Sequence, residues 1–133
     1  MALITTPFPG ARITTPYGKK GAWAAGFHTG DDFACRVGTP LRSMWTGTVV
    51  GINSWGSAYG VHVIIQFQPK GGAVRRMAYC HMSKVAVKVG TRVVPGSHIG
   101  WSGNTGRTTG PHLHLEQRLA PFGYNNRCVK PIY

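Results

Sequence analysis

The sequence predicts an all-β protein whose short strands form an antiparallel sheet or two packed sheets. Its 19 glycines and 9 prolines interrupt the chain every few residues, which leaves little room for long helices. Several short segments alternate between apolar and polar residues, and this is the pattern of half-buried strands. No long segment shows the period of an amphipathic helix.

The 133 residues are expected to form one domain, because 42% of them are hydrophobic and a chain of this length buries about two-thirds of its unfolded surface. We expect the core of this domain at about 11–119. The two ends, 1–10 and 120–133, contain proline and are expected to pack as irregular extensions.

Strands are predicted at several places before residue 100. "DFACRV" (32–37) follows a glycine-containing turn, and "GTVVGIN" (47–53) is rich in β-branched residues. "PKGG" (69–72) predicts a turn, with "VRRMAYCHM" (74–82) as the second strand of a hairpin. The first strand of that hairpin, "GVHVIIQFQ" (60–68), alternates and places four apolar residues on one face: Val61, Val63, Ile65 and Phe67.

The strand predicted at "HLHLEQRL" (112–119) carries two histidines two residues apart. Residues at this spacing point to the same face of a strand, so His112, His114 and Glu116 share a face while the leucines between them enter the core. Two imidazoles on one strand form half of a zinc site. The pair alone is also compatible with a surface strand that carries histidines.

A second candidate motif is "HTGDD" (28–32), where His28 and Asp32 are separated by a tight turn at Gly30. An aspartate in a turn is common without any metal. Together with one histidine of the later strand, however, these residues make a set of three ligands. Three protein ligands and one open position are typical of a catalytic zinc site, and a neighbouring histidine could act there as a base.

"HTGDD", "YCHMSK" and "VPGSHIGWSGNTGRTTGPHLHLE", in this order, resemble the lysostaphin-like (LytM-type) zinc endopeptidases, which cut peptide cross-links in bacterial cell walls. The resemblance runs from about Thr14 to Leu119. It implies an all-β fold of that type with loops forming a substrate groove, one Zn²⁺ per chain, and a stem or bridge peptide of peptidoglycan as substrate.

The resemblance also implies roles for single residues. His28, Asp32 and His114 would bind zinc, His112 would be the general base, and His81 would orient water or stabilise the developing oxyanion. Where this chain has Asp31, the family usually has an aliphatic residue. Asp31 could pair with an arginine, line the groove, or replace Asp32 as the ligand.

Other residues near these motifs have less specific interpretations. Glu116 is expected to hold a zinc-binding imidazole or an arginine. Strand alternation turns Cys80 away from His81 and from the site, which indicates a structural cysteine. The glycines of "SGNTGRTTG" lack the lysine of a phosphate loop and are expected to shape a turn beside the metal. His62 and His98 are expected to be exposed. The large aromatic residues could line a groove or pack in the core: Trp23, Trp45, Trp55, Tyr59 and Trp101.

The net charge of +12 predicts attraction to polyanions, which include nucleic acid and an anionic cell wall. The ordered histidine motifs favour the wall and make a nucleic-acid partner the weaker alternative. A non-catalytic wall-binding or regulatory member of the same fold is the other alternative, although such proteins typically lose metal ligands. Cys35, Cys80 and Cys128 show no CxxC pair, so buried thiols are expected, with one disulfide as the alternative.

The N-terminal segment "MALITTPFPG" shows no signal peptide, and no segment is apolar enough to span a membrane. We therefore expect synthesis in the cytoplasm of a host cell. The protein is expected to be a monomer. By analogy the chain looks like a phage endolysin that reaches the wall through a holin pore, or a virion-associated wall hydrolase.

Overall fold

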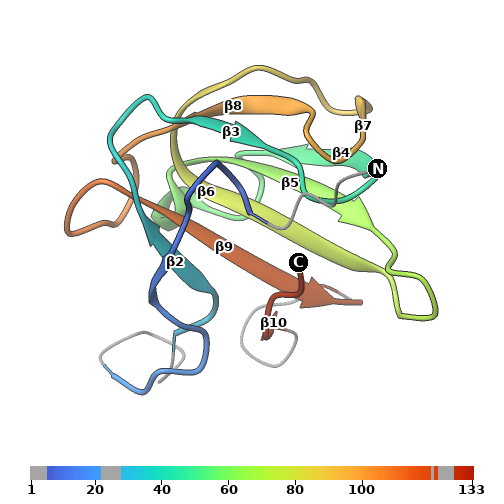
Figure 1. Cartoon of the computed structure of the whole chain (residues 1–133), viewed down its shortest axis with the longest axis horizontal. Helices are drawn as coiled ribbons and strands as arrows, with labels where there is room; N and C mark the ends of the chain where they lie inside the picture. Colours follow the sequence, from blue (N-terminus) through green and yellow to red (C-terminus); the bar gives the residue numbers. More distant parts are fainter. Residues whose placement is uncertain (1–5, 22–27, 121, 123–127) are drawn as a thin grey trace.

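The computed structural model describes residues 6–21, 28–120, 122 and 128–133 (Figure 1). In this part of the chain the one helical element is a short 3₁₀ turn, η1 (Ser57–Tyr59), so the prediction of an all-β protein is confirmed. No helix of these residues could cross a membrane. The structure has these strands: β1 (Ile13–Thr15), β2 (Asp31–Ala34), β3 (Pro40–Arg42), β4 (Gly47–Ile52), β5 (Val61–Phe67), β6 (Arg75–Val85), β7 (Arg92–Val93), β8 (His98–Ser102), β9 (His112–Leu119) and β10 (Cys128–Val129).

The strands form one antiparallel sheet in the order β1-β2-β9-β6-β5-β4-β7. Strands β5, β6 and β9 are the long central ones, and β8 pairs with both β6 and β3 (Figure 1). The predicted hairpin is present, since β5 and β6 pair with Ile64 opposite Ala78 and are joined by a turn closed between Gly72 and Pro69. The strands predicted at 47–53 and 112–119 are also confirmed.

The C-terminal extension is less irregular than predicted. β10 pairs with β9, placing Cys128 opposite Arg118. The physical reason is that β2 covers only the first half of this edge of β9, from His112 to Leu115, and leaves the rest available for pairing.

The main core lies on one face of the central strands. Val63, Ile65 and Phe67 of β5 are buried in it, as the alternation predicted, and so are Leu113 and Leu115 of β9. A smaller apolar cluster on the other face contains Ile64, Ala78 and Cys80.

The prediction that Cys80 turns away from the site is wrong. Cys80 lies directly opposite His114, and residues that face each other across antiparallel strands point to the same side of the sheet. Strand alternation fails at the next residue because His81 has a φ of 61°, in the left-handed region, and the pairing of β5 with β6 shifts there. Cys80 and His81 therefore both lie on the side of His114. Cys80 is nevertheless a buried thiol in an apolar cluster, and all three cysteines are thiols rather than disulfides.

The prediction of an exposed His62 is also wrong, whereas His98 is exposed as expected. The His62 ring is fully buried. Its Nδ1 lies 2.8 Å from the carbonyl oxygen of Gly60, and its Nε2 accepts a hydrogen bond from the Trp55 amide at 2.9 Å. Burial lowers the pKa of this imidazole, so it is neutral and holds the loop before β5 in place.

Candidate metal centre and active site

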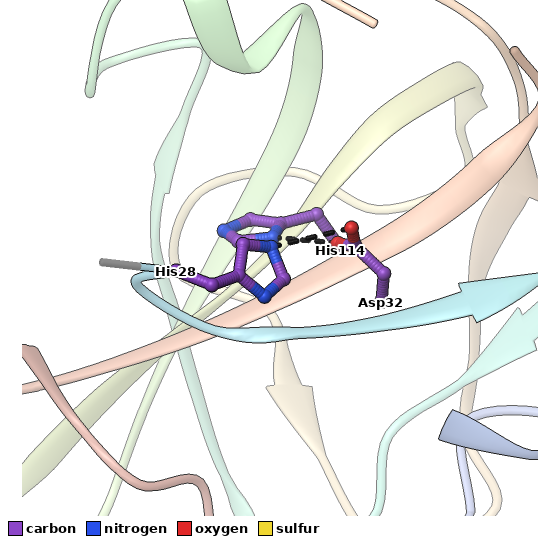
Figure 2. Close-up of side chains that lie close together, drawn as sticks. All are labelled: His28, Asp32 and His114. Atoms are coloured by element: carbon purple, nitrogen blue, oxygen red, sulfur yellow. Dashed lines mark hydrogen bonds and ion pairs between the residues drawn. The ribbon is translucent and has the colours of Figure 1, made fainter. Parts of the chain in front are cut away.

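The three predicted ligands, His28, Asp32 and His114, come together on the face of the sheet opposite the main core. Asp32 on β2 is the direct cross-strand partner of His114 on β9, and His28 lies in the turn before β2. The carboxylate contacts both imidazoles: Asp32 Oδ2 is 3.2 Å from His28 Nε2, and Asp32 Oδ1 is 2.9 Å from His114 Nδ1 (Figure 2). Donor atoms of all three residues lie within 4.8 Å of one another.

Four imidazoles at this site share one arrangement, in which the outer ring nitrogen contacts a group that can only accept a hydrogen bond. Nδ1 of His28, His81 and His112 lies 3.2, 2.7 and 2.8 Å from the carbonyl oxygens of Pro16, Thr105 and Gly110. Nε2 of His114 lies 3.1 Å from a Glu116 carboxylate oxygen. Each outer nitrogen must therefore carry the proton, so in the neutral ring the other nitrogen presents a lone pair to the site.

The four rings differ in what their inner nitrogens face. His28 Nε2 and His114 Nδ1 face the Asp32 carboxylate, and without a proton these two nitrogens would offer their lone pairs to a metal ion beside it. His112 is next to them, with Nε2 3.7 Å from Asp32 Oδ1. The His81 ring lies 4.9 Å from the His112 ring, centroid to centroid. Two imidazoles and one carboxylate with an open side match the donor set of a catalytic zinc ion.

The protonation of the site fits metal binding. Burial opposes charge on Asp32, but hydrogen bonds with His114 and His28 outweigh it and hold the pKa of the carboxyl well below its usual range. Burial likewise opposes charge on His114, but Asp32 and Glu116 raise the pKa of this imidazole to about 9. A proton on His114 thus occupies the place that a metal ion would take. Burial is the largest cause that lowers the pKa of His81, to about 4, so His81 is neutral at pH 7.

Glu116 is fully buried beneath His114 and contacts both an imidazole and an arginine, the two partners expected for it. Thr29 donates a hydrogen bond to it at 2.6 Å, and Tyr59 donates another at 3.0 Å. The guanidinium of Arg118 lies 2.7 Å away. Burial favours the neutral acid, but His114 and Arg118 outweigh it and lower the pKa of Glu116 to about 2. The carboxylate is therefore ionised and fixes the orientation of His114.

Arg118 also belongs to this site, although it is part of none of the motifs that predicted the site. Its guanidinium stacks on Trp55 at 3.6 Å and donates to the Tyr59 hydroxyl at 2.9 Å. A signal was present, because Arg118 continues the alternation that places His112, His114 and Glu116 on one face of β9. The aromatic residues that could line a groove or pack in the core divide between the two positions. Trp55 and Tyr59 line the cleft, whereas Trp45 packs on Phe67 and Trp101 packs against His98. Trp23 lies outside the described residues.

Asp31 does not contribute to the site, which excludes it as an alternative ligand to Asp32. It is paired with Leu115, so its side chain lies on the core face of β2, where it is almost fully buried. Its carboxylate accepts hydrogen bonds from the Tyr17 amide and the Tyr133 hydroxyl, both at 2.7 Å. The expectation that Asp31 pairs with an arginine or lines the groove is therefore wrong: it ties both ends of the chain to the sheet.

The candidate ligands lie in a cleft of about 1080 Å³. The glycine-rich loop before β9 forms part of it and needs its glycines for close packing, as expected for a shaped turn. A Cβ on Gly103 would lie 2.5 Å from the Ser83 amide nitrogen, and one on Gly106 (φ 79°) would lie 2.3 Å from that of Gly60. The described residues that line the cleft are Thr15, Lys19, Lys20, Gly21, His28, Thr29, Asp32, Trp55, Ala58, Tyr59, His81, Arg107, Thr108, Thr109, His112, His114 and Arg118.

Comparisons with known proteins agree with this geometry. The model of peptidase family M23 matches residues 26–131. Glycyl-glycine endopeptidase ALE-1 of Staphylococcus capitis is 40% identical over 109 residues, which are 80% of this chain and 28% of that protein. Peptidoglycan DD-endopeptidase ShyA of Vibrio cholerae is 46% identical over 89 residues, which are 67% of this chain and 20% of that protein. The chain thus spans less than a third of the length of these two relatives.

Among solved structures, the catalytic domain of the antimicrobial peptidase lysostaphin from Staphylococcus simulans is similar along nearly its whole length. The two structures superpose with a TM-score of 0.80 at 34% identity, covering 91% of this chain and 89% of that chain. The predicted lysostaphin-like fold is therefore confirmed.

Proposed function

Since the chain belongs to peptidase family M23, we propose that it is a zinc-dependent endopeptidase that hydrolyses peptide cross-links of bacterial peptidoglycan. The observation that carries this proposal is the group His28, Asp32 and His114 in the cleft, with two further imidazoles beside it. The names of the two relatives, a glycyl-glycine endopeptidase and a peptidoglycan DD-endopeptidase, support the substrate class.

In this proposal His28 Nε2, Asp32 and His114 Nδ1 hold the zinc ion. When bound there, zinc would polarise the carbonyl of the bond to be cut and make an attacking water more acidic. Glu116 keeps the proton on His114 Nε2, so that the lone pair of Nδ1 stays directed at the metal position.

His112 is proposed as the general base. Its Nδ1 proton is held by the Gly110 carbonyl, and its Nε2 lone pair lies next to the ligands, where it can take a proton from the attacking water and return it to the leaving amine. His81 is proposed to orient that water. Because its Nδ1 donates to Thr105, the neutral ring accepts a hydrogen bond at Nε2, which suits a water better than an oxyanion.

The basic surface supports a second part of the proposal, namely that the protein is attracted to an anionic cell wall. Action as a monomer, in phage-mediated lysis of the host cell or as a virion component, stays a prediction. Expression inside a bacterial host with and without a holin tests the lysis role: lysis that requires the holin supports it, and lysis that is independent of the holin contradicts it.

Hydrolysis of purified sacculi tests the proposed activity. Zinc-loaded protein should solubilise sacculi, a chelator should abolish the reaction, and added zinc should restore it. The variant His112→Gln provides the matched control, because it should bind zinc and leave the sacculi intact. Folded, zinc-loaded protein that solubilises no sacculi would contradict the proposal.

A further inference from the structure

Three cations on the rim of the cleft have no role in the proposed hydrolysis. Lys19, Lys20 and Arg107 line the cleft, and all three are exposed. We call these three residues the cationic rim.

Backbone hydrogen bonds fix the cationic rim to the segments that hold the site. The carbonyl of Lys19 accepts a hydrogen bond from the amide of His28 at 2.8 Å. On another segment, the amide of Arg107 donates a hydrogen bond to the Ala58 carbonyl at 2.9 Å. Arg107 is two residues after Thr105, whose carbonyl contacts the His81 ring. The backbone at Lys19 and Arg107 is therefore held by the same turns that place His28 and His81.

The sheet order indicates that the cations flank the site from two sides. Strand β9, with His112 and His114, has β2 and β1 on one side and β6 and β5 on the other. The lysines follow β1, whereas Arg107 contacts the η1 turn that precedes β5. A peptide bound across β9 would have a cation near each of its two flanks.

The chain offers these cations no side-chain carboxylate. Its three acidic residues are Asp31, Asp32 and Glu116. Asp31 is buried on the core face and contacts the Tyr17 amide and the Tyr133 hydroxyl, Asp32 contacts two imidazoles, and Glu116 is buried with Arg118. The positive charge at the rim is thus left for a ligand. Thr15 and Thr109 also line the cleft, and a threonine hydroxyl can donate a hydrogen bond to an oxyanion.

We propose that the cationic rim binds a carboxylate of the substrate, so that the cleft prefers peptides with a free carboxylate beside the bond that is cut over uncharged glycine chains. This inference rests on the proposed endopeptidase function and defines its specificity. An arginine fork and two ammonium groups are the donors that pair with carboxylates, and a cleft of one sign of charge concentrates ligands of the other.

The test compares three synthetic substrates of the zinc-loaded protein. The first is a branched peptide whose released residue carries a free carboxylate next to the scissile bond, the second is the same peptide with that carboxylate converted to a carboxamide, and the third is pentaglycine. At low ionic strength we expect kcat/KM for the carboxylate to exceed that for the carboxamide by about tenfold, if each of the three cations contributes about two- to threefold. Salt should reduce this ratio because it screens exposed charges.

Variants assign the preference to the rim. Arg107→Gln should lower the carboxylate-to-carboxamide ratio by about two- to threefold, and the double variant Lys19→Gln/Lys20→Gln by about four- to ninefold. Arg92→Gln and Lys70→Gln are matched controls, because they remove the same charge from exposed positions that do not line the cleft, and their ratios should stay at the wild-type value. Equilibrium binding of both peptides to the His112→Gln variant provides a readout independent of turnover and should show the same preference.

Each outcome has a distinct meaning. Equal cleavage of carboxylate and carboxamide, unchanged in the rim variants, would overturn the inference and leave the proposed function intact, as would a preference for pentaglycine. If a soluble polyphosphate inhibits all cleavage and kcat/KM is the same for the two peptides, the cationic rim binds an anionic wall polymer instead. That result would also overturn the inference. Failure to cleave any peptide or sacculus would overturn the proposed function itself.

Discussion

Replacing Glu116 with glutamine should weaken zinc binding although Glu116 is not a ligand. The substitution keeps the shape of a fully buried side chain and removes its charge. Its carboxylate contacts His114 Nε2 at 3.1 Å and the Arg118 guanidinium at 2.7 Å. A neutral amide would hold the imidazole less firmly and would present an NH₂ group to residues that donate hydrogen bonds.

The contacts of Glu116 set the expected magnitudes. Loss of a hydrogen-bonding partner of a metal ligand typically lowers metal affinity by about 10- to 100-fold. Removing one member of a buried ion pair costs about 3–5 kcal/mol of the free energy of unfolding. Since Arg118 would keep the Tyr59 hydroxyl and its stack on Trp55, we expect a loss near the low end, about 3 kcal/mol, in the metal-free protein.

Competition with a zinc chelator of known affinity measures the first quantity, and denaturant unfolding of the metal-free protein measures the second. Asp31→Asn is the matched control, because it neutralises another buried carboxylate, one residue before a ligand but on the other face of β2. Asp31→Asn should lose about 1–3 kcal/mol of stability and keep its zinc affinity. Wild-type zinc affinity in Glu116→Gln would refute the role of Glu116, and weakened zinc affinity in Asp31→Asn would refute the exclusion of Asp31 as a ligand.

Further predictions concern the histidines. His112→Gln should retain zinc by elemental analysis while turnover falls about 10²- to 10⁴-fold, and near-normal turnover would exclude His112 as the base. His28→Ala should lose both zinc and activity, so full zinc content would contradict its place among the ligands. Zinc binding should release a proton at pH 7, because the pKa of His114 is raised to about 9 in the metal-free protein and the metal displaces that proton. Calorimetry in two buffers of different ionisation enthalpy measures the number of protons released. A release of no protons would contradict the prediction.

The sequence predicts the parts of the site that depend on strict strand alternation. His112, His114 and Glu116 lie on one face of β9 and the intervening leucines in the core, as the period of two requires. Asp32 and His114 lie on strands that are far apart in the chain. Their pairing is non-local, and the resemblance to a known family indicated it where local pattern could not.

The errors arise where one residue breaks the alternation or where a polar side chain finds buried partners. The left-handed conformation of His81 brings Cys80 and His81 to one side, and the sequence does not signal it, because only a few per cent of all residues other than glycine adopt a positive φ. His62 is buried because a carbonyl and an amide of the segment before β5 satisfy both of its ring nitrogens. Asp31 is buried because Tyr17 and Tyr133 converge on it from the two ends of the chain, and this tertiary contact leaves no local pattern in the sequence.

We propose that the His28, Asp32 and His114 group serves a zinc-dependent hydrolysis of cell-wall peptides. The decisive experiment is mass spectrometry of the amino termini that appear when zinc-loaded protein acts on purified sacculi. We expect new amino termini at one type of cross-link, all of which disappear when a chelator is present. No new amino termini from folded, zinc-loaded protein, or termini that appear equally with the chelator, would contradict it.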